Sequence, residues 1–127
     1  MNRFIGIPFS DNKESFEGAN CYGLARLFYK EELGIIINEL NVPSAHSNKV
    51  FATFLHEISK DWEEIEEPEF GCIVAMAHDL AHPKIVQHVG IYVGDGKIIH
   101  TINKLDSHVS KLEMLKPIIR GFYKWRH

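Results

Sequence analysis

The chain has 127 residues, of which 45% are hydrophobic and 24% charged, a balance that excludes a disordered or low-complexity chain. This length predicts one folded domain spanning residues 1–127. Fourteen basic against seventeen acidic side chains exclude a general polyanion binder, so we expect no nucleic-acid partner. The chain also lacks a signal-peptide pattern and any membrane-length apolar stretch. We therefore expect no membrane insertion and a protein that is cytoplasmic as synthesised.

The first half predicts helices after a loop-rich arm over residues 1–20. Asn20 is a good N-cap, the apolar stripe that follows has helical spacing, and Gly34 suits the helix end. A second amphipathic helix is expected around residues 50–58. The acidic segment 61–70 is interpreted as a solvated connector, anchored by Trp62 and Ile65.

The second half predicts strands. Residues 71–77 form a short continuous apolar run, which suits a strand buried on both faces. Residues 85–93 and 97–102 flank a Gly-Asp-Gly tripeptide and predict a hairpin. Segments 109–115 and 117–125 supply two further strands, the second basic and expected at a solvated sheet edge. Helices followed by antiparallel strands indicate an α+β domain.

Cys21 is the candidate nucleophile because it directly follows the predicted N-cap. Free backbone N–H groups and the helix dipole favour a thiolate there, so we expect a lowered thiol pKa. The same N–H groups could receive an oxyanion. The alternative is an ordinary buried cysteine, which is also the simplest interpretation of Cys72.

The hairpin offers a base and a partner that orients it, namely His88 and His100. A two-residue turn at Asp95-Gly96 would place the two histidines on opposite faces. A three-residue loop, with Gly96 left-handed, pairs Val93 with Lys97 and makes the histidines diagonal neighbours on one face. Glycine at the third loop position favours the second register.

A metal site is the competing interpretation of the same residue types. Cys72, His78, His82, His88 and His100 are all possible ligands, and His78 and His82 are four residues apart. That spacing needs a helix to aim both rings at one metal, whereas it falls here on a polar loop closed by Pro83. We therefore expect no metal and no cofactor.

Three segments together resemble the NlpC-type cysteine peptidases of the papain-like superfamily. They are GIPFSDNKESFEGANCYGLARLFYKEELGI, the stretch from Trp62 to Gly71, and HVGIYVGDGKIIH. The nucleophile segment is most similar to members found in phage tail assembly and tail-tip proteins. The resemblance covers nearly the whole chain.

The resemblance implies a papain-like fold with N-terminal helices on an antiparallel sheet of five or six strands. It also implies hydrolysis of peptidoglycan peptide stems, typically beside a D-glutamyl residue, with Cys21 as nucleophile, His88 as base and acid, and His100 orienting His88. Other phage tail proteins would be partners, and the virion tail or the cell envelope the place of action.

Phe9, Asn20 and Tyr22 occupy the positions that the resemblance associates with the oxyanion site and substrate positioning. Family members usually have Tyr where this chain has Phe9 and Asp where it has Asn20, and Asn12-Lys13 replaces a frequent Gly-Gly. These departures motivate an alternative function, a structural or wall-binding tail module of the same fold. A Cys–His acyltransferase or thioesterase is a further alternative.

Overall fold

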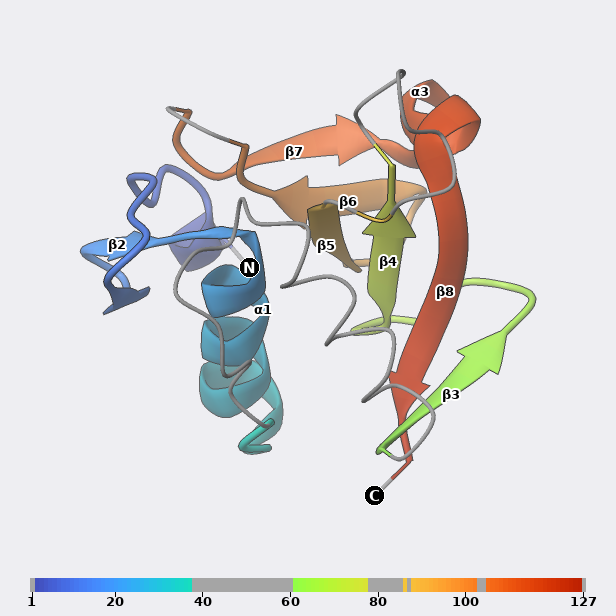
Figure 1. Ribbon diagram of the computed structural model, residues 1–127, viewed down its shortest axis with the longest axis horizontal. Helices are drawn as coiled ribbons and strands as arrows, with labels where there is room; N and C mark the ends of the chain where they lie inside the picture. Colours follow the sequence, from blue (N-terminus) through green and yellow to red (C-terminus); the bar gives the residue numbers. More distant parts are fainter. Residues whose placement is uncertain (1, 38–60, 78–85, 87, 103–104, 127) are drawn as a thin grey trace.

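The computed structural model describes residues 2–37, 61–77, 86, 88–102 and 105–126 (Figure 1). The expected helix at 50–58 lies outside these residues, as do His78 and His82. The helical elements are η1 (Asn2–Phe4), α1 (Cys21–Phe28), the π-helical turn η2 (Tyr29–Leu33), α3 (Leu112–Leu115) and η3 (Lys116–Ile118). The strands are β1 (Glu14–Ser15), β2 (Gly18–Ala19), β3 (Trp62–Ile65), β4 (Ile73–Met76), β5 (His88–Tyr92), β6 (Lys97–His100), β7 (His108–Lys111) and β8 (Ile119–Trp125).

Six strands form one antiparallel sheet in the order β3-β8-β4-β5-β6-β7, and β1 and β2 pair separately. This arrangement confirms the α+β class and the expected five or six strands. Strand β8 lies between β3 and β4, so its expected place at a sheet edge was wrong.

The edge position is taken instead by β3, which pairs with β8. This strand lies in the acidic segment that we interpreted from the sequence as a solvated connector. Trp62, the first residue of β3, is buried, and its ring packs edge-on against Trp125 of β8 at 5.1 Å between centroids. Glu63 and Glu64 are exposed, and Lys124 of β8 lies 3.5 Å from Glu63. The charges therefore belong to solvent-facing positions of a sheet edge.

The expected strand over 109–115 is only half right, because β7 ends at Lys111 and Leu112–Leu115 forms the short helix α3. Leu112 and Leu115 pack against Val74, Met76 and Ile98 on one face of the sheet. A turn of helix points both leucines at that face, because residues three apart share one side of a helix. In a strand they would point to opposite faces of the sheet.

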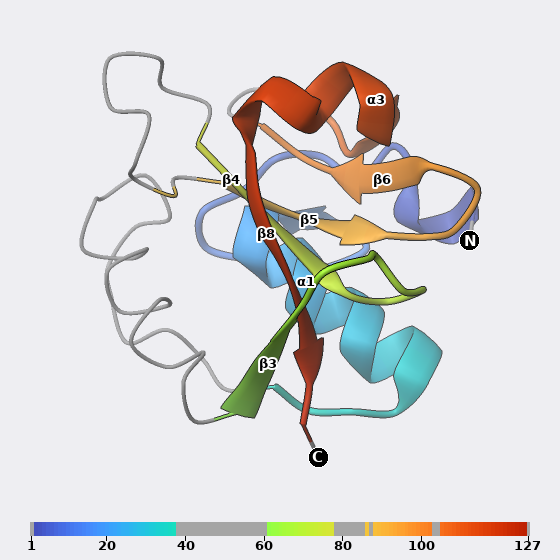
Figure 2. The same cartoon turned by 90° about the vertical axis from the view of Figure 1, so that its right-hand side faces the viewer.

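Helix α1 covers the opposite face of the sheet, as the two views show (Figures 1 and 2). Its buried side chains Leu24 and Phe28 share one core with Val89, Ile91 and other strand residues. The helical spacing of the apolar residues therefore gives α1 one apolar side, and this side packs against β5.

The N-terminal arm is tied to the connection between β6 and β7. The buried hydroxyl of Ser107 accepts a hydrogen bond from the Ile7 N–H at 2.8 Å and donates one to the Phe4 carbonyl at 2.6 Å. Backbone hydrogen bonds join Gly6 and Ile7 to the same residue. These contacts hold the arm, and with it Phe9, beside the start of α1.

Candidate active site

The first turn of α1 presents Cys21. Asn20 is the N-cap, with an extended backbone, and its side-chain oxygen accepts the Gly23 N–H at 2.7 Å. A Cβ on Gly23 would stand 3.1 Å from that oxygen, so a glycine here leaves the cap undistorted. The predicted helix start is therefore confirmed, and the chain's order Asn-Cys-Tyr-Gly places the thiol at the positive end of the helix.

Cys21 is buried, with 6% of its surface exposed. Burial raises the pKa of its thiol to about 11, although backbone groups of Val89, Tyr22 and Cys21 itself lower it. The expectation of a lowered pKa was therefore wrong, because desolvation of the thiolate outweighs the helix start. The resting sulfur is a protonated thiol at neutral pH.

The hairpin has the register that aligns the two histidines. Ile91 pairs with Ile99 and Tyr92 with Ile98, and the Val93 N–H donates to the Lys97 carbonyl at 2.9 Å. The three-residue loop is thus confirmed. Gly96 is left-handed as expected, and so are Asp95 and Gly94. Continuing the register by one residue places His100 opposite Gly90.

The two histidines are in direct contact. His88 Nε2 lies 2.7 Å from His100 Nδ1, and both rings are buried. His100 Nε2 lies 2.7 Å from Ser110 Oγ, so each nitrogen of His100 has a partner. Ser110 was not predicted from the sequence. Strand alternation gives the face of β7 on which it lies, but only the pairing of β7 with β6 places it beside His100.

His100 is an uncharged imidazole at neutral pH. Burial lowers its pKa to about 4, and the charge of His108 lowers it further in the same direction. The His108 ring lies next to that of His100, with 4.6 Å between the ring centroids. A neutral ring can orient His88 through a hydrogen bond but cannot supply it with a counter-charge.

Cys21 and His88 approach the same end of β5. A backbone group of Val89, the residue after His88, interacts with the thiol. The pleat sends Val89 toward α1, whereas His88 belongs with Met76, its partner in β4, to the other face. His88 is the first residue of β5, so its ring lies at the end of that strand, next to the residue whose backbone interacts with the thiol.

The other candidate residues surround the helix start. Tyr22 is buried, and its backbone interacts with the Cys21 thiol. Phe9 is half-buried and forms a parallel bridge with Ala19, two residues before Cys21. Because phenylalanine has no hydroxyl, Phe9 can line the site but cannot donate to an oxyanion.

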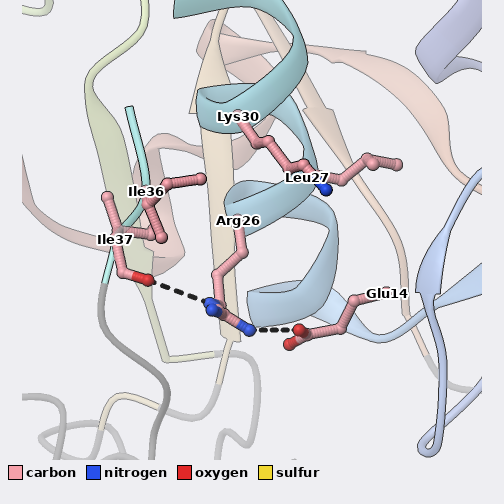
Figure 3. A pocket seen from close by; sticks show the side chains of 6 residues that line it. All are labelled: Glu14, Arg26, Leu27, Lys30, Ile36 and Ile37. Atoms are coloured by element: carbon pink, nitrogen blue, oxygen red, sulfur yellow. Dashed lines mark hydrogen bonds and ion pairs between the residues drawn. The ribbon is translucent and has the colours of Figure 1, made fainter. Parts of the chain in front are cut away.

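A pocket of about 200 Å³ lies on the outer side of α1 (Figure 3). Arg26 crosses it, forming an ion pair with Glu14 and donating from Nε to the Ile37 carbonyl at 3.1 Å. These contacts fasten β1 and the chain after η2 to the helix. The other lining residues are Leu27, Lys30 and Ile36, so the pocket is separate from the histidine pair.

Within the described ranges, no three histidine, cysteine or acidic side chains are grouped closely enough to hold a metal ion. His88 Nε2 and His100 Nδ1 contact each other, so each of these two nitrogens already has a partner. The same ranges contain no helix that is both long and apolar enough to cross a membrane.

Comparison with known proteins identifies a family for this sequence pattern. The pattern of the NlpC/P60 family matches residues 6–122. The gamma-D-glutamyl-L-lysine dipeptidyl-peptidase of Bacillus cereus is 29% identical over 98 residues, which are 77% of this chain and 25% of that protein. The chain thus spans about a quarter of the length of that relative.

Solved structures show the same fold. The NlpC/p60 domain of the peptidoglycan hydrolase SagA matches with a TM-score of 0.65 at 19% identity, covering 96% of this chain and 90% of that one. NlpC2 from Trichomonas vaginalis matches with 0.66 at 20% identity, covering 94% and 43%. An NlpC/P60 family protein from Bacillus cereus matches with 0.66 at 24% identity, covering 96% and 36%. The expected papain-like fold is confirmed.

Proposed function

Because the chain belongs to the NlpC/P60 family, we propose that it is a cysteine peptidase that cleaves peptide stems of bacterial peptidoglycan. The observation that carries the proposal is the 2.7 Å contact between His88 and His100, at the end of β5 where the Cys21 thiol also lies. The family match over residues 6–122 supports treating residues 1–127 as one catalytic domain.

In the proposed reaction the Cys21 sulfur attacks the carbonyl carbon of a stem amide while its proton passes to His88. Nδ1 is the nitrogen that would take it, because Nε2 contacts His100. The C–N bond then breaks and His88 returns the proton to the leaving amine. Water, deprotonated by the same ring, hydrolyses the thioester and releases a carboxylate and the thiol. Backbone N–H groups at the start of α1 would stabilise the oxyanion.

The bond beside a D-glutamyl residue is the proposed target. The support is the name of the Bacillus cereus relative, whose substrate is a γ-D-glutamyl-L-lysine peptide. Asn20, Phe9 and Tyr22 would line the entry to the thiol. The cap holds the Asn20 oxygen on Gly23, so only the amide nitrogen of Asn20 would face a substrate.

The test is release of soluble peptides from purified peptidoglycan, measured by chromatography and mass spectrometry. Cys21→Ala should abolish release. Cys72→Ala is the matched control, because Cys72 is also a buried free cysteine whose thiol pKa is raised to about 11. Equal release by wild type and Cys21→Ala would refute the assignment of the nucleophile.

We also propose that this domain acts at the cell envelope as part of a phage or prophage tail, with other tail proteins as partners. The support is the likeness of residues 21–35 to tail-associated members of the family. Mass spectrometry of purified phage particles from the source strain should find the chain among tail proteins. Its absence from particles that contain the other tail proteins would contradict this setting.

A structural or wall-binding module of the same fold is the second candidate. Two observations favour it, the raised thiol pKa of Cys21 and the missing hydroxyl at Phe9. Such a module would sediment with peptidoglycan and release no peptides, and Cys21→Ala would leave binding unchanged. Peptide release that depends on Cys21 would exclude it.

A further inference from the structure

Ser110 extends the histidine pair by one residue. In the register of β6 with β7, Ile98 pairs with Ser110 and His100 with His108. Ser110 is therefore the diagonal neighbour of His100 on one side, as His88 is on the other. The three side chains form one row across β5, β6 and β7, with both gaps equal to 2.7 Å.

The row has only two arrangements of protons when both rings are neutral, because a neutral imidazole carries one N–H and one acceptor nitrogen. In the first, His88 Nε2–H donates to His100 Nδ1, and His100 Nε2–H donates to the Ser110 hydroxyl oxygen. In the second every bond is reversed: Ser110 donates to His100, and His100 donates to His88 Nε2. Whether the hydroxyl at the end of the row accepts or donates is thus linked to the tautomer of both rings.

Only the first arrangement leaves His88 Nδ1 without a proton. The second puts the proton of His88 on Nδ1, where it would block transfer from a thiol. Ser110 is half-buried on the edge strand, so its own O–H can donate to solvent while its oxygen accepts from His100. His100 is 4% exposed, so its two ring nitrogens depend on His88 and Ser110 for their hydrogen bonds.

We infer that Ser110 is a positioning residue that accepts the His100 Nε2–H and so favours the His88 tautomer whose Nδ1 carries no proton. Its catalytic consequence rests on the proposed peptidase function, whereas the tautomer itself does not. The neutral state of His100 that the row requires agrees with its pKa of about 4.

The first experiment measures tautomers in the resting protein by ¹⁵N NMR of labelled histidines at pH 7. The wild type should show the proton of His100 on Nε2 and that of His88 also on Nε2. Ser110→Ala should shift His100 toward the Nδ1–H form. Ser110→Thr, which keeps the hydroxyl, should retain the wild-type pattern. Lys111→Ala, an exposed neighbour on the same strand, is the control.

The second experiment measures peptide release by the same variants. Loss of one hydrogen bond of about 1 to 1.5 kcal/mol predicts that Ser110→Ala lowers kcat about tenfold with little change in KM. Ser110→Thr should restore most of kcat. A structural defect would instead lower the melting temperature and affect Ser110→Thr as well.

The two readouts separate the inference from the function it rests on. A wild-type protein with His100 protonated on Nδ1 overturns the inference, even if Ser110→Ala fails to fold. Unchanged tautomers and unchanged kcat in Ser110→Ala overturn it too. A wild type that releases no peptides but shows the expected tautomers refutes the proposed function and leaves the role of Ser110 in the row supported.

Discussion

The rings of His100 and His108 lie side by side across β6 and β7, with 4.6 Å between their centroids and their planes tilted by 52°. His108 is half-buried, whereas His100 is buried and already occupied by His88 and Ser110. A proton on His100 would therefore place a charge in a buried site and next to a neighbour of like charge. This arrangement couples acid pH to the stability of the sheet.

We predict that His100 destabilises the fold in acid. Its pKa is lowered to about 4 from an ordinary value of 6.5, so the native state resists a proton that the unfolded chain binds. Above pH 6.5 His100 costs no free energy of unfolding, and the free energy of unfolding falls as the pH drops from 6.5 toward 4. The loss is about 3 kcal/mol at about 1.4 kcal/mol per pKa unit.

The measurement is the free energy of unfolding by urea between pH 7 and pH 4 for wild type and His100→Asn. The variant keeps a polar partner for His88 but removes the titrating group, so its curve should be flatter over this range. His108→Gln should give an intermediate slope, because it removes the charge that lowers the His100 pKa. Parallel curves for wild type and His100→Asn would contradict the prediction.

A second prediction concerns thiol reactivity. At pH 7 a pKa of about 11 leaves roughly one Cys21 in ten thousand as thiolate, against about one in a hundred for a free thiol of pKa 9.0. Iodoacetamide should therefore modify folded Cys21 at least about 100-fold more slowly than a free thiol. Mass spectrometry of the digested protein reports each site.

Cys72 serves as the comparison, because burial also raises its thiol pKa to about 11. Both cysteines should react slowly in the folded protein and rapidly in urea. Fast modification of Cys21 alone would contradict the prediction, because it would mean that the resting site holds a thiolate despite the burial of the sulfur.

The hairpin was predictable from the sequence because its loop and its alternation act locally. Glycine at position 96 selected the register, and the register brought His88 to His100. The Asn20 cap was predictable for the same reason. Ser110 was not, because the connection from β6 to β7 is too long to fix their pairing. The raised thiol pKa of Cys21 was not predicted, because it comes from burial. Burial depends on how α1 packs in the fold, whereas the position of a residue at a helix end can be inferred from the sequence alone.

A third prediction tests the close approach of strands around the histidine pair. A Cβ on Gly90 would stand 2.7 Å from Ile98 Cγ2 and 3.2 Å from His100 Cβ. Gly90→Ala should therefore destabilise the protein by about 1 to 3 kcal/mol, as overpacked cores do. It should also shift the ¹⁵N signals of His100.

The matched background is Ile98→Ala, which removes the Cγ2 atom that the added methyl group would meet. Gly90→Ala should cost less stability in the Ile98→Ala protein than in the wild type, and urea unfolding of the two single variants and the double variant measures the difference. A single Gly90→Ala protein as stable as wild type would show that β5 and β6 lie farther apart than the register implies.

The last prediction separates the cap from the substrate site. Asn20→Ala removes the acceptor of the Gly23 N–H and should lower the free energy of unfolding by about 1 kcal/mol. Asn20→Asp keeps the acceptor and adds a negative charge at the positive end of α1, so it should be as stable as wild type or more so. The same charge next to Cys21 opposes a thiolate, so Asn20→Asp should slow alkylation further. Urea unfolding measures the effect on stability, and mass spectrometry of the modified protein measures the effect on alkylation. An Asn20→Ala protein of wild-type stability would mean that the cap contributes nothing to the helix that presents the thiol.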